Sequence, residues 1–405
     1  MEKRPQIWIY AIVCTIATIT AVGFGRMAYG ILMPFMKESL SLSYQQMGML
    51  GTSTAIGYLS LVLFAGILAA KWGSKKLVVL GNLLVAFGLL YLSWAQSFFA
   101  CLAGMILLGI GAAFTYTPVV NIVVGWFPNR RGMMIGFVIS GLGLGSLIAS
   151  ALIPFFTAWY SDNGWRYLWL VFSIIAFISA VVSYFILRDP PEVSRKTAAK
   201  SHSFLRDVYL NHKVILVAVI YGLIGFAYLI PQSFLFSFIL DTGINSYSAG
   251  QLMSLGSIMS IFSGPLWGAV SDKIGRKMSL LVTLLLGAVS VIIPIGFPTY
   301  LGFVICQFLW GINVVGMLSL IQALSTEQVH QSYAPVALGY TTVYFAVGQL
   351  AGPGLGGWMI DHFGGIPPVL FLCSGLLILA FLLSLQVNKK AVQVQFVLQS
   401  VEGQD

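Results

Sequence analysis

The chain has 405 residues, of which 58% are hydrophobic and only 8% are charged. Soluble domains carry roughly 25% charged residues, so this composition excludes water as the main solvent. The net charge of +9 does not indicate a nucleic-acid partner, because the basic residues fall between apolar segments at regular intervals. We therefore expect a membrane protein with the lipid bilayer as its direct partner and no nucleic acid.

Apolar segments of about 18 residues or more recur along the chain, each long enough to cross a bilayer as a helix. They are apolar on all sides, whereas barrel strands alternate with period two. The first follows a short polar start without a cleavage site, so we expect it to be retained. We predict an all-α membrane protein with twelve transmembrane helices, near residues 7–36, 46–70, 77–95, 98–127, 133–157, 165–187, 214–239, 247–270, 278–297, 299–324, 335–360 and 367–387.

The basic residues predict the orientation of these helices. With both termini in the cytoplasm, 18 of the 21 Lys and Arg residues fall on the cytoplasmic side, as the positive-inside rule requires. We expect a monomeric, multi-pass protein of the cell inner (cytoplasmic) membrane. We divide it into an N-terminal six-helix bundle (1–187), a cytoplasmic linker (188–213), a C-terminal six-helix bundle (214–387) and a cytoplasmic tail (388–405).

The two halves of the chain repeat one another at an offset of about 202 residues. Segment 66–75 corresponds to segment 268–277, and Gly23 corresponds to Gly225. Such a duplication predicts two bundles related by a pseudo-twofold axis along the membrane normal. The solute site is then expected between the bundles, near the midplane.

The second copy of the repeated loop, Gly-Ala-Val-Ser-Asp-Lys-Ile-Gly-Arg-Lys over 268–277, together with the 6+6 plan, resembles the major facilitator superfamily over nearly the whole chain. In that family the loop helps to hold one transport state through charge contacts. The first copy departs from the pattern, with Ala70 where an acid is usual. A basic turn that only fixes topology is the alternative. The resemblance implies a gating role for Gly66, Gly73, Gly268, Asp272, Gly275 and Arg276.

Two further strings carry narrower resemblances. Segment 126–132, followed by Gly136, Gly141 and Gly145, resembles the fifth-helix signature of the monocarboxylate and oxalate/formate antiporter branches, which implies an organic-anion solute. Segment 23–30 resembles a bacterial subgroup whose solutes are largely unassigned. The predicted eighth span departs from the named branches, because it offers serines and a glutamine where those branches carry a basic residue.

Arg26 is the one charged residue that we place well inside a predicted span, since Arg166 stands at the end of its span and all twelve acids and all four histidines fall in loops, tails or helix ends. Ionisable groups within a membrane are costly and mark functional sites. We predict that Arg26 faces the cavity and pairs with a carboxylate of the solute, because its planar guanidinium suits bidentate binding. The alternative is that Arg26 extends to the membrane surface or caps nearby carbonyls.

Uncharged polar residues in the predicted spans are further candidates for solute binding. Tyr29 lies one turn from Arg26, and Tyr228 occupies the repeat position of Arg26. For each candidate the alternative is a hydrogen bond between neighbouring helices. The rest of the predicted substrate-binding set comprises Tyr116, Asn121, Gln232, Asn313, Tyr340 and Tyr344.

These observations predict a secondary or facilitative transporter that moves a small organic anion, a carboxylate, by alternating access. The absence of a membrane-embedded acid or histidine from the predicted spans favours anion exchange (antiport) or facilitated diffusion, with a proton carried by the solute carboxylate itself as the alternative. An exporter of amphipathic compounds or drugs is the alternative, given the 14% aromatic content. A membrane sensor and an enzyme are disfavoured, because there is neither an appended soluble domain nor a catalytic cluster. The glycine strings lack the context of a nucleotide site and the cysteines lack metal spacing, so we expect no cofactor.

Overall fold

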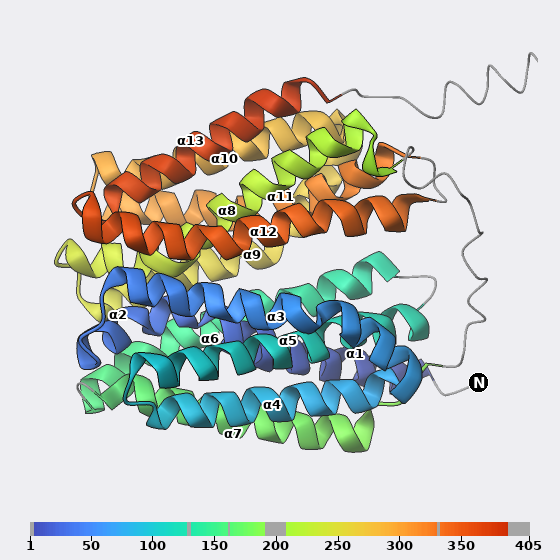
Figure 1. The fold of residues 1–405 in the computed structure, drawn as a ribbon, viewed down its shortest axis with the longest axis horizontal. Coiled ribbons are helices and arrows are strands. Elements are labelled where there is room, and N and C mark those ends of the chain that lie inside the picture. Colours follow the sequence, from blue (N-terminus) through green and yellow to red (C-terminus); the bar gives the residue numbers. More distant parts are fainter. Residues whose placement is uncertain (1–3, 128–130, 161–162, 191–207, 330–332, 388–405) are drawn as a thin grey trace, which may run out of the picture.

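The computed structural model describes residues 4–127, 131–160, 163–190, 208–329 and 333–387. These residues form helices joined by short connections (Figure 1). The helices are α1 (Arg4–Thr18), the π-helix η1 (Ile19–Met27), α2 (Tyr29–Ser39), α3 (Tyr44–Trp72), α4 (Ser74–Trp94), α5 (Phe98–Trp126), α6 (Arg131–Tyr160), α7 (Gly164–Ile186), α8 (His212–Asp241), α9 (Ser246–Ile274), α10 (Arg276–Gly296), α11 (Tyr300–Glu327), α12 (Ala334–His362) and α13 (Pro367–Leu385).

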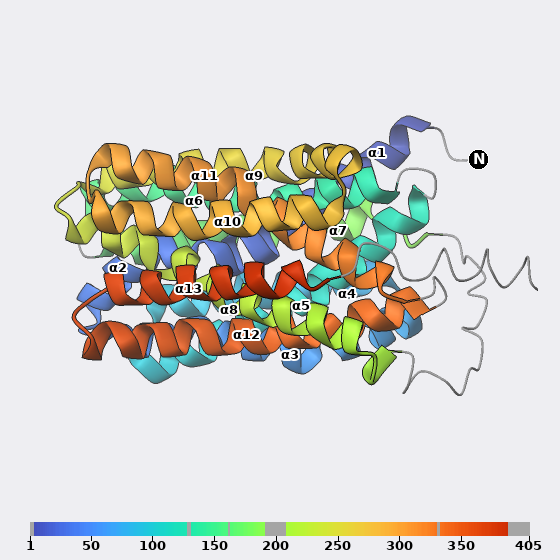
Figure 2. The same ribbon diagram turned by 90° about the horizontal axis from the view of Figure 1, so that it is seen from above.

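The helices form twelve rods, because α1, η1 and α2 follow one another as a single rod. Within the described residues, ten helices are long and apolar enough to cross a membrane. The two remaining rods, α3 and α12, have 29 residues each. All run along one long axis (Figure 2). The prediction of an all-α protein with twelve transmembrane helices is confirmed.

The rods form two layers, α1 to α7 in one and α8 to α13 in the other (Figure 1). Equivalent pairs pack in each layer: α3 on α5 matches α9 on α11, and α4 on α7 matches α10 on α13. Between the layers, α3 packs on α12 and α6 on α9, a pattern that the pseudo-twofold maps onto itself. The predicted domain limits stay predictions, and most of the linker and the tail after 387 lie outside the described residues.

The repeat extends to the residues that begin and end the helices. Ser43 accepts a hydrogen bond from the backbone N–H of Gln46 at the start of α3, and Asn245, 202 positions later, caps α9 in the same way. Gly73 and Gly275 join the following helices with φ of 91° and 87°, a backbone conformation that favours glycine. Both halves therefore build the same helix-turn-helix unit from equivalent positions.

The two layers are hydrogen-bonded at the end of the molecule opposite the start of α1 and the end of α13. We call this the distal end and the other the terminal end (Figure 1). Between α3 and α12, the Thr52 hydroxyl donates to the Leu350 carbonyl at 2.9 Å. Between α6 and α9, the hydroxyls of Ser150 and Ser254 lie 2.8 Å apart. The serines of α9 thus join the two halves.

At the terminal end, the same faces of α3 and α9 do not touch the other half within the described residues. Five helical turns span about 18 residues, so Gly48 and Gly66 share one face of α3, and Gly250 and Gly268 share one face of α9. A side chain at Gly48 would collide with Pro353 of α12, and one at Gly250 would collide with α6. A Cβ atom at Gly66 or Gly268 would meet no other atom within 4 Å. The halves are therefore closed together distally and separated at the terminal end.

A carboxylate of one half caps a helix of the other at the distal end. Asp361 of α12 accepts hydrogen bonds from the backbone N–H groups of Tyr44 and Gln45, at 3.1 and 2.7 Å, in the first turn of α3. The Tyr44 hydroxyl donates to Asp241 at 3.2 Å. A negative charge is stabilised at a helix N-terminus, where N–H groups lack partners. This contact stabilises the distally closed arrangement.

Replacing Asp361 with Asn should favour opening of the distal end, because the amide loses the charge that attracts the α3 N-terminus. A charge in this position contributes about 0.3–1 kcal/mol, so we expect a roughly 2- to 5-fold faster reaction of a cysteine placed at Thr54 with a membrane-impermeant maleimide. The matched control is Glu38→Gln, which neutralises an exposed acid at the same end. Equal labelling rates in D361N and E38Q would contradict this role.

Candidate functional site

Arg26 lies in a π-helical segment of the first rod, within the predicted span 7–36; the sequence analysis predicted the span and not this change of helix type. The segment η1 has Arg26 in its last turn. Single π-turns are rare and occur often at functional sites. Gly23 of η1 packs backbone to backbone on α6, where a Cβ at Gly23 would lie 2.7 Å from the Cα of Gly145. The contact between these two glycines thus fixes the position of η1 along α6 and the direction in which the Arg26 side chain extends.

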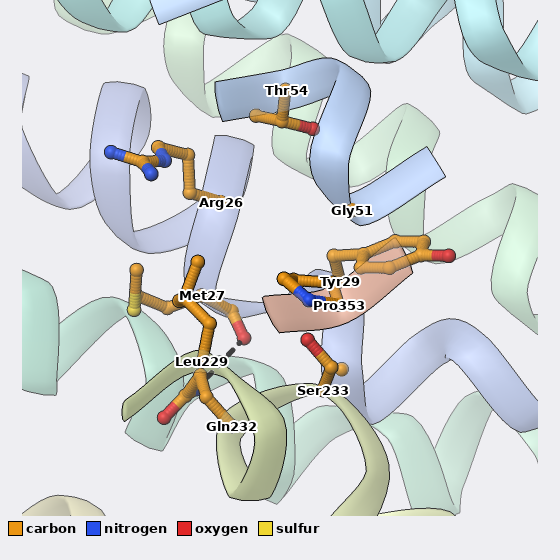
Figure 3. Close-up of a pocket in the computed structure, with 10 residues that line it drawn as sticks. Arg26, Met27, Tyr29, Gly51, Thr54, Leu229, Gln232, Ser233 and Pro353 are labelled. Carbon is orange, nitrogen blue, oxygen red and sulfur yellow. Dashed lines mark hydrogen bonds between the residues drawn. The ribbon is translucent and has the colours of Figure 1, made fainter. Parts of the chain in front are cut away.

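The Arg26 side chain is half-buried and lies between tyrosines of the two halves. Its guanidinium carbon is 5.0 Å from the ring centroid of Tyr58 on α3. Tyr228 of α8, in the other half, lies near the guanidinium, and its hydroxyl is 3.6 Å from the sulfur of the adjacent Met27. Figure 3 shows the guanidinium directed away from Gln232 and Ser233. Among the described residues, no carboxylate forms an ion pair with Arg26, so its charge is available to a solute.

Further tyrosine side chains from both halves lie near Tyr58. Besides Tyr58 and Tyr228, Tyr116 of α5 and Tyr221 of α8 lie within electrostatic range of Tyr58. Tyr221 stacks on Phe345 of α12 with ring centroids 4.3 Å apart. The environment therefore combines one cation with phenol groups and aromatic faces, which suits an anion that carries an apolar body.

The distal side of Arg26 is closed by contacts between η1 and α8. The Gln232 amide donates to the Met27 carbonyl at 3.3 Å, and the Tyr228 hydroxyl lies 3.6 Å from the Met27 sulfur. A pocket beside them, drawn in Figure 3, has a free volume of about 20 Å³. That is room for a water molecule and not for an organic solute. Arg26 therefore stands at the boundary between the closed distal contact and the separated terminal end.

The structure brings some predicted binding residues to Arg26 and places others elsewhere. Tyr228 lies near Arg26, Gln232 lines the same pocket as Arg26, and Tyr116 lies near Tyr58. Tyr29 lines the same pocket, but its hydroxyl donates to the Met47 carbonyl at 2.6 Å. Asn313 is fully buried and donates to the Thr283 carbonyl of α10 at 2.7 Å.

The remaining predicted binding residues lie nearer the terminal end. On α12, the hydroxyls of Tyr340 and Tyr344 are 3.0 Å apart, and the Tyr340 ring packs against Tyr209. Asn121, half-buried, lies near the end of α5. These side chains are not gathered around Arg26 in this conformation, and their part in binding stays a prediction.

The predicted gating residues lie at the terminal end, where the halves are apart. Asp272 is exposed, and Arg276 pairs with Glu327 of the same half, with Nη1 and Oε1 2.6 Å apart. The first copy of the repeated loop has Ala70 where an acid is usual. In this copy, near Gly73, Asp189 accepts a hydrogen bond from the backbone N–H of Lys75 at 2.8 Å. The gating assignment stays a prediction.

Tyr58 is the residue at this site that the sequence analysis missed. It stands in an apolar span, and its repeat position is Ser260, so the duplication carries no signal for it. The helical periodicity of α3 gave only a weak signal for Tyr58. The residue lies one turn from Thr54 and two turns from Gly51, both of which line the pocket. Only the structure shows that its ring meets the guanidinium of Arg26, because this contact depends on how α3 lies relative to the first rod.

Comparison with known proteins identifies the family. The model of the Major Facilitator Superfamily matches residues 15–266 and 234–396. The chain therefore belongs to the major facilitator superfamily. Among solved structures it is similar to a bacterial homologue of the human lysosomal transporter Spinster, with a TM-score of 0.77 at 16% identity, covering 94% of this chain and 98% of that one. This likeness shows the fold.

Three curated relatives bear on the solute. Monocarboxylate transporter 2 of Rattus norvegicus is 24% identical, covering 81% of this chain and 74% of the relative. The Oxalate:formate antiporter of Oxalobacter formigenes is 26% identical, covering 74% and 72%. The Agnestins efflux protein AgnL12 of Paecilomyces divaricatus is 22% identical, covering 93% and 86%. The chain is a multi-pass membrane transporter of a small molecule, and not an enzyme.

The packing of Gly145 predicts a sharp difference between two glycines of α6. A side chain at Gly145 would collide with Gly23 and displace η1, whereas one at Gly136 would meet open space. We expect Gly145→Ala to lower the melting temperature of the purified protein by several degrees, as overpacking of about 1–3 kcal/mol implies, and to reduce transport. Gly136→Ala is the matched control and should leave both unchanged. Equal behaviour of the two variants would contradict the placement of η1.

Proposed function

We propose that the protein carries a small organic anion, a carboxylate, across the membrane by alternating access. The observation that supports this most directly is the Arg26 guanidinium, which lies between the two halves without a carboxylate partner among the described residues. An isolated cation in a hydrophobic bundle is costly, and a bound carboxylate offsets that cost with charge-assisted hydrogen bonds. The relatives named for monocarboxylate and for oxalate and formate support the same solute class.

The same charge favours exchange over one-way transport. To return empty, the carrier must close both ends around an unpaired guanidinium, which costs several kcal/mol in a poorly hydrated site. A carboxylate bound for the return step removes that cost. The described spans place no acid or histidine beside Arg26 to accept a coupling proton. We therefore propose antiport of anions.

A second candidate function is export of amphipathic compounds. The relative named as an efflux protein favours it, and so do the stacked Tyr221 and Phe345 beside the site. This function has no use for the cation. Drug-resistance assays on cells that express the protein separate the two candidates, because an exporter would protect cells whether or not Arg26 is present.

The orientation and setting belong to the same proposal. We infer that the terminal end faces the cytoplasm, because the basic residues concentrate in the segments that lie there. The separated end of the bundle then opens to the cytoplasm in this structure. We place the protein in the inner (cytoplasmic) membrane and expect it to act as a monomer, since each chain has its own pair of halves.

Replacing Arg26 with Gln should abolish uptake of radiolabelled carboxylates into proteoliposomes. Loss of one partner of a desolvated charge pair costs about 2–5 kcal/mol, which is roughly 30-fold or more in apparent affinity. Arg26→Lys should retain part of the activity, because the charge stays while the bidentate geometry is lost. The control is Lys76→Gln, at an exposed basic residue of the terminal end. Wild-type uptake by R26Q would remove Arg26 from the mechanism and defeat the carboxylate proposal.

Exchange predicts that uptake depends on an anion on the other side of the membrane. Proteoliposomes preloaded with unlabelled carboxylate should take up label at least about tenfold faster than empty ones, since 1.4 kcal/mol of avoided charge burial corresponds to tenfold. A protonophore should have no effect. Uptake into empty proteoliposomes at the same rate, or strict dependence on a proton gradient, would contradict exchange.

A further inference from the structure

The Tyr58 ring is the cation–π partner that the structure gives to Arg26, with 5.0 Å between the guanidinium carbon and the ring centroid. A cation over an aromatic face is attracted by the ring's negative face, and this attraction grows where water is scarce. The face of a ring uses no strong acceptor, so the N–H donors of the guanidinium stay free for a solute. Tyr58 can therefore hold Arg26 without competing with the solute.

The backbone of α3 around Tyr58 is fixed by its close packing on α5. A side chain at Gly57 would collide with the carbonyl of Ile106, and a side chain at Gly109 would collide with Thr54 and lie 2.7 Å from the backbone nitrogen of Tyr58. Two helices that touch through glycines leave little freedom for relative sliding. The backbone that carries the Tyr58 ring is therefore held rigidly against α5.

The pair occurs in one half alone. The repeat position of Arg26 is Tyr228 and that of Tyr58 is Ser260, so neither member has an equivalent in the second half. The duplicated scaffold thus carries the cation and its aromatic partner together on the N-terminal half and neither of them on the other. The two residues therefore differ from the duplicated scaffold together, as we expect of two residues that act together.

We infer that Tyr58 is a positioning residue for solute binding, whose ring holds the Arg26 guanidinium in the orientation that captures the carboxylate. The inference rests on the proposed function. When the ring is lost, the guanidinium regains rotamer freedom and hydration, both of which must be lost again when a solute binds. Because Tyr58 acts on the group that every carboxylate shares, its removal weakens all carboxylates by the same factor.

The experiment measures KM and kcat for acetate, lactate and benzoate in proteoliposomes that contain wild-type protein, Tyr58→Phe, Tyr58→Leu or Tyr58→Met. We expect Y58F to resemble wild type, because it keeps the aromatic face. Y58L and Y58M should raise KM by about 2- to 30-fold, equally for the three solutes, with kcat little changed. Y58M is a second variant without an aromatic face, and it replaces Y58L in the experiment if Y58L fails to fold. The control is Tyr91→Leu, at an exposed ring of α4.

Each other outcome overturns the inference. Unequal factors for the three solutes would mean that the ring contacts the body of the solute, and a loss of kcat at constant KM would mean a role in folding or movement. If R26Q is inactive while Y58L keeps the wild-type KM, this inference fails and the proposed function stands. If R26Q transports as wild type does, the proposed function fails and the inference fails with it.

Discussion

The structure depends on one constraint, which is a single guanidinium held between two hydrophobic helical bundles without a counter-charge among the described residues. Arg26 leaves the first rod from a π-helical segment, and the contact of Gly23 with Gly145 determines where that segment lies. Tyr58 from one half and Tyr228 from the other flank the cation. We propose that such a site takes an occupant with one negative charge, because a single carboxylate neutralises the guanidinium and a second would itself lack a partner.

The arrangement of the halves gives this site access from one side. Hydrogen bonds such as Thr52 to Leu350 close the distal half of the interface, and Asp361 adds a charge contact to the start of α3. On the same helix faces, the surroundings of Gly66 and Gly268 are open. Small residues allow close helix approach in membranes, so these two glycines suit contacts that form when the terminal end closes in turn. In the alternating access that we propose, one set of contacts is exchanged for the other around a fixed cation.

Much of this architecture could be predicted from the sequence, because hydropathy, basic residues and a 202-residue repeat each carry direct physical signals. The repeat even places the helix caps at Ser43 and Asn245. Arg26 could be found since a charge inside an apolar span is rare. The π-helix could not, because hydropathy is blind to a change in helical pitch. Nor could Tyr58, or the buried setting of Asn313, because both depend on which face of one helix meets another.

We propose that the solute's carboxylate binds the guanidinium of Arg26. Solid-state NMR on protein labelled with ¹⁵N in the arginine side chains, with a ¹³C-carboxylate-labelled solute, measures that contact directly. We expect a carbon–nitrogen separation of about 4 Å or less, as in a charge-assisted hydrogen bond, and we expect this coupling to disappear in R26K because the lysine side chain carries no label. Saturable binding without this coupling, or a coupling that persists in R26K, would contradict it.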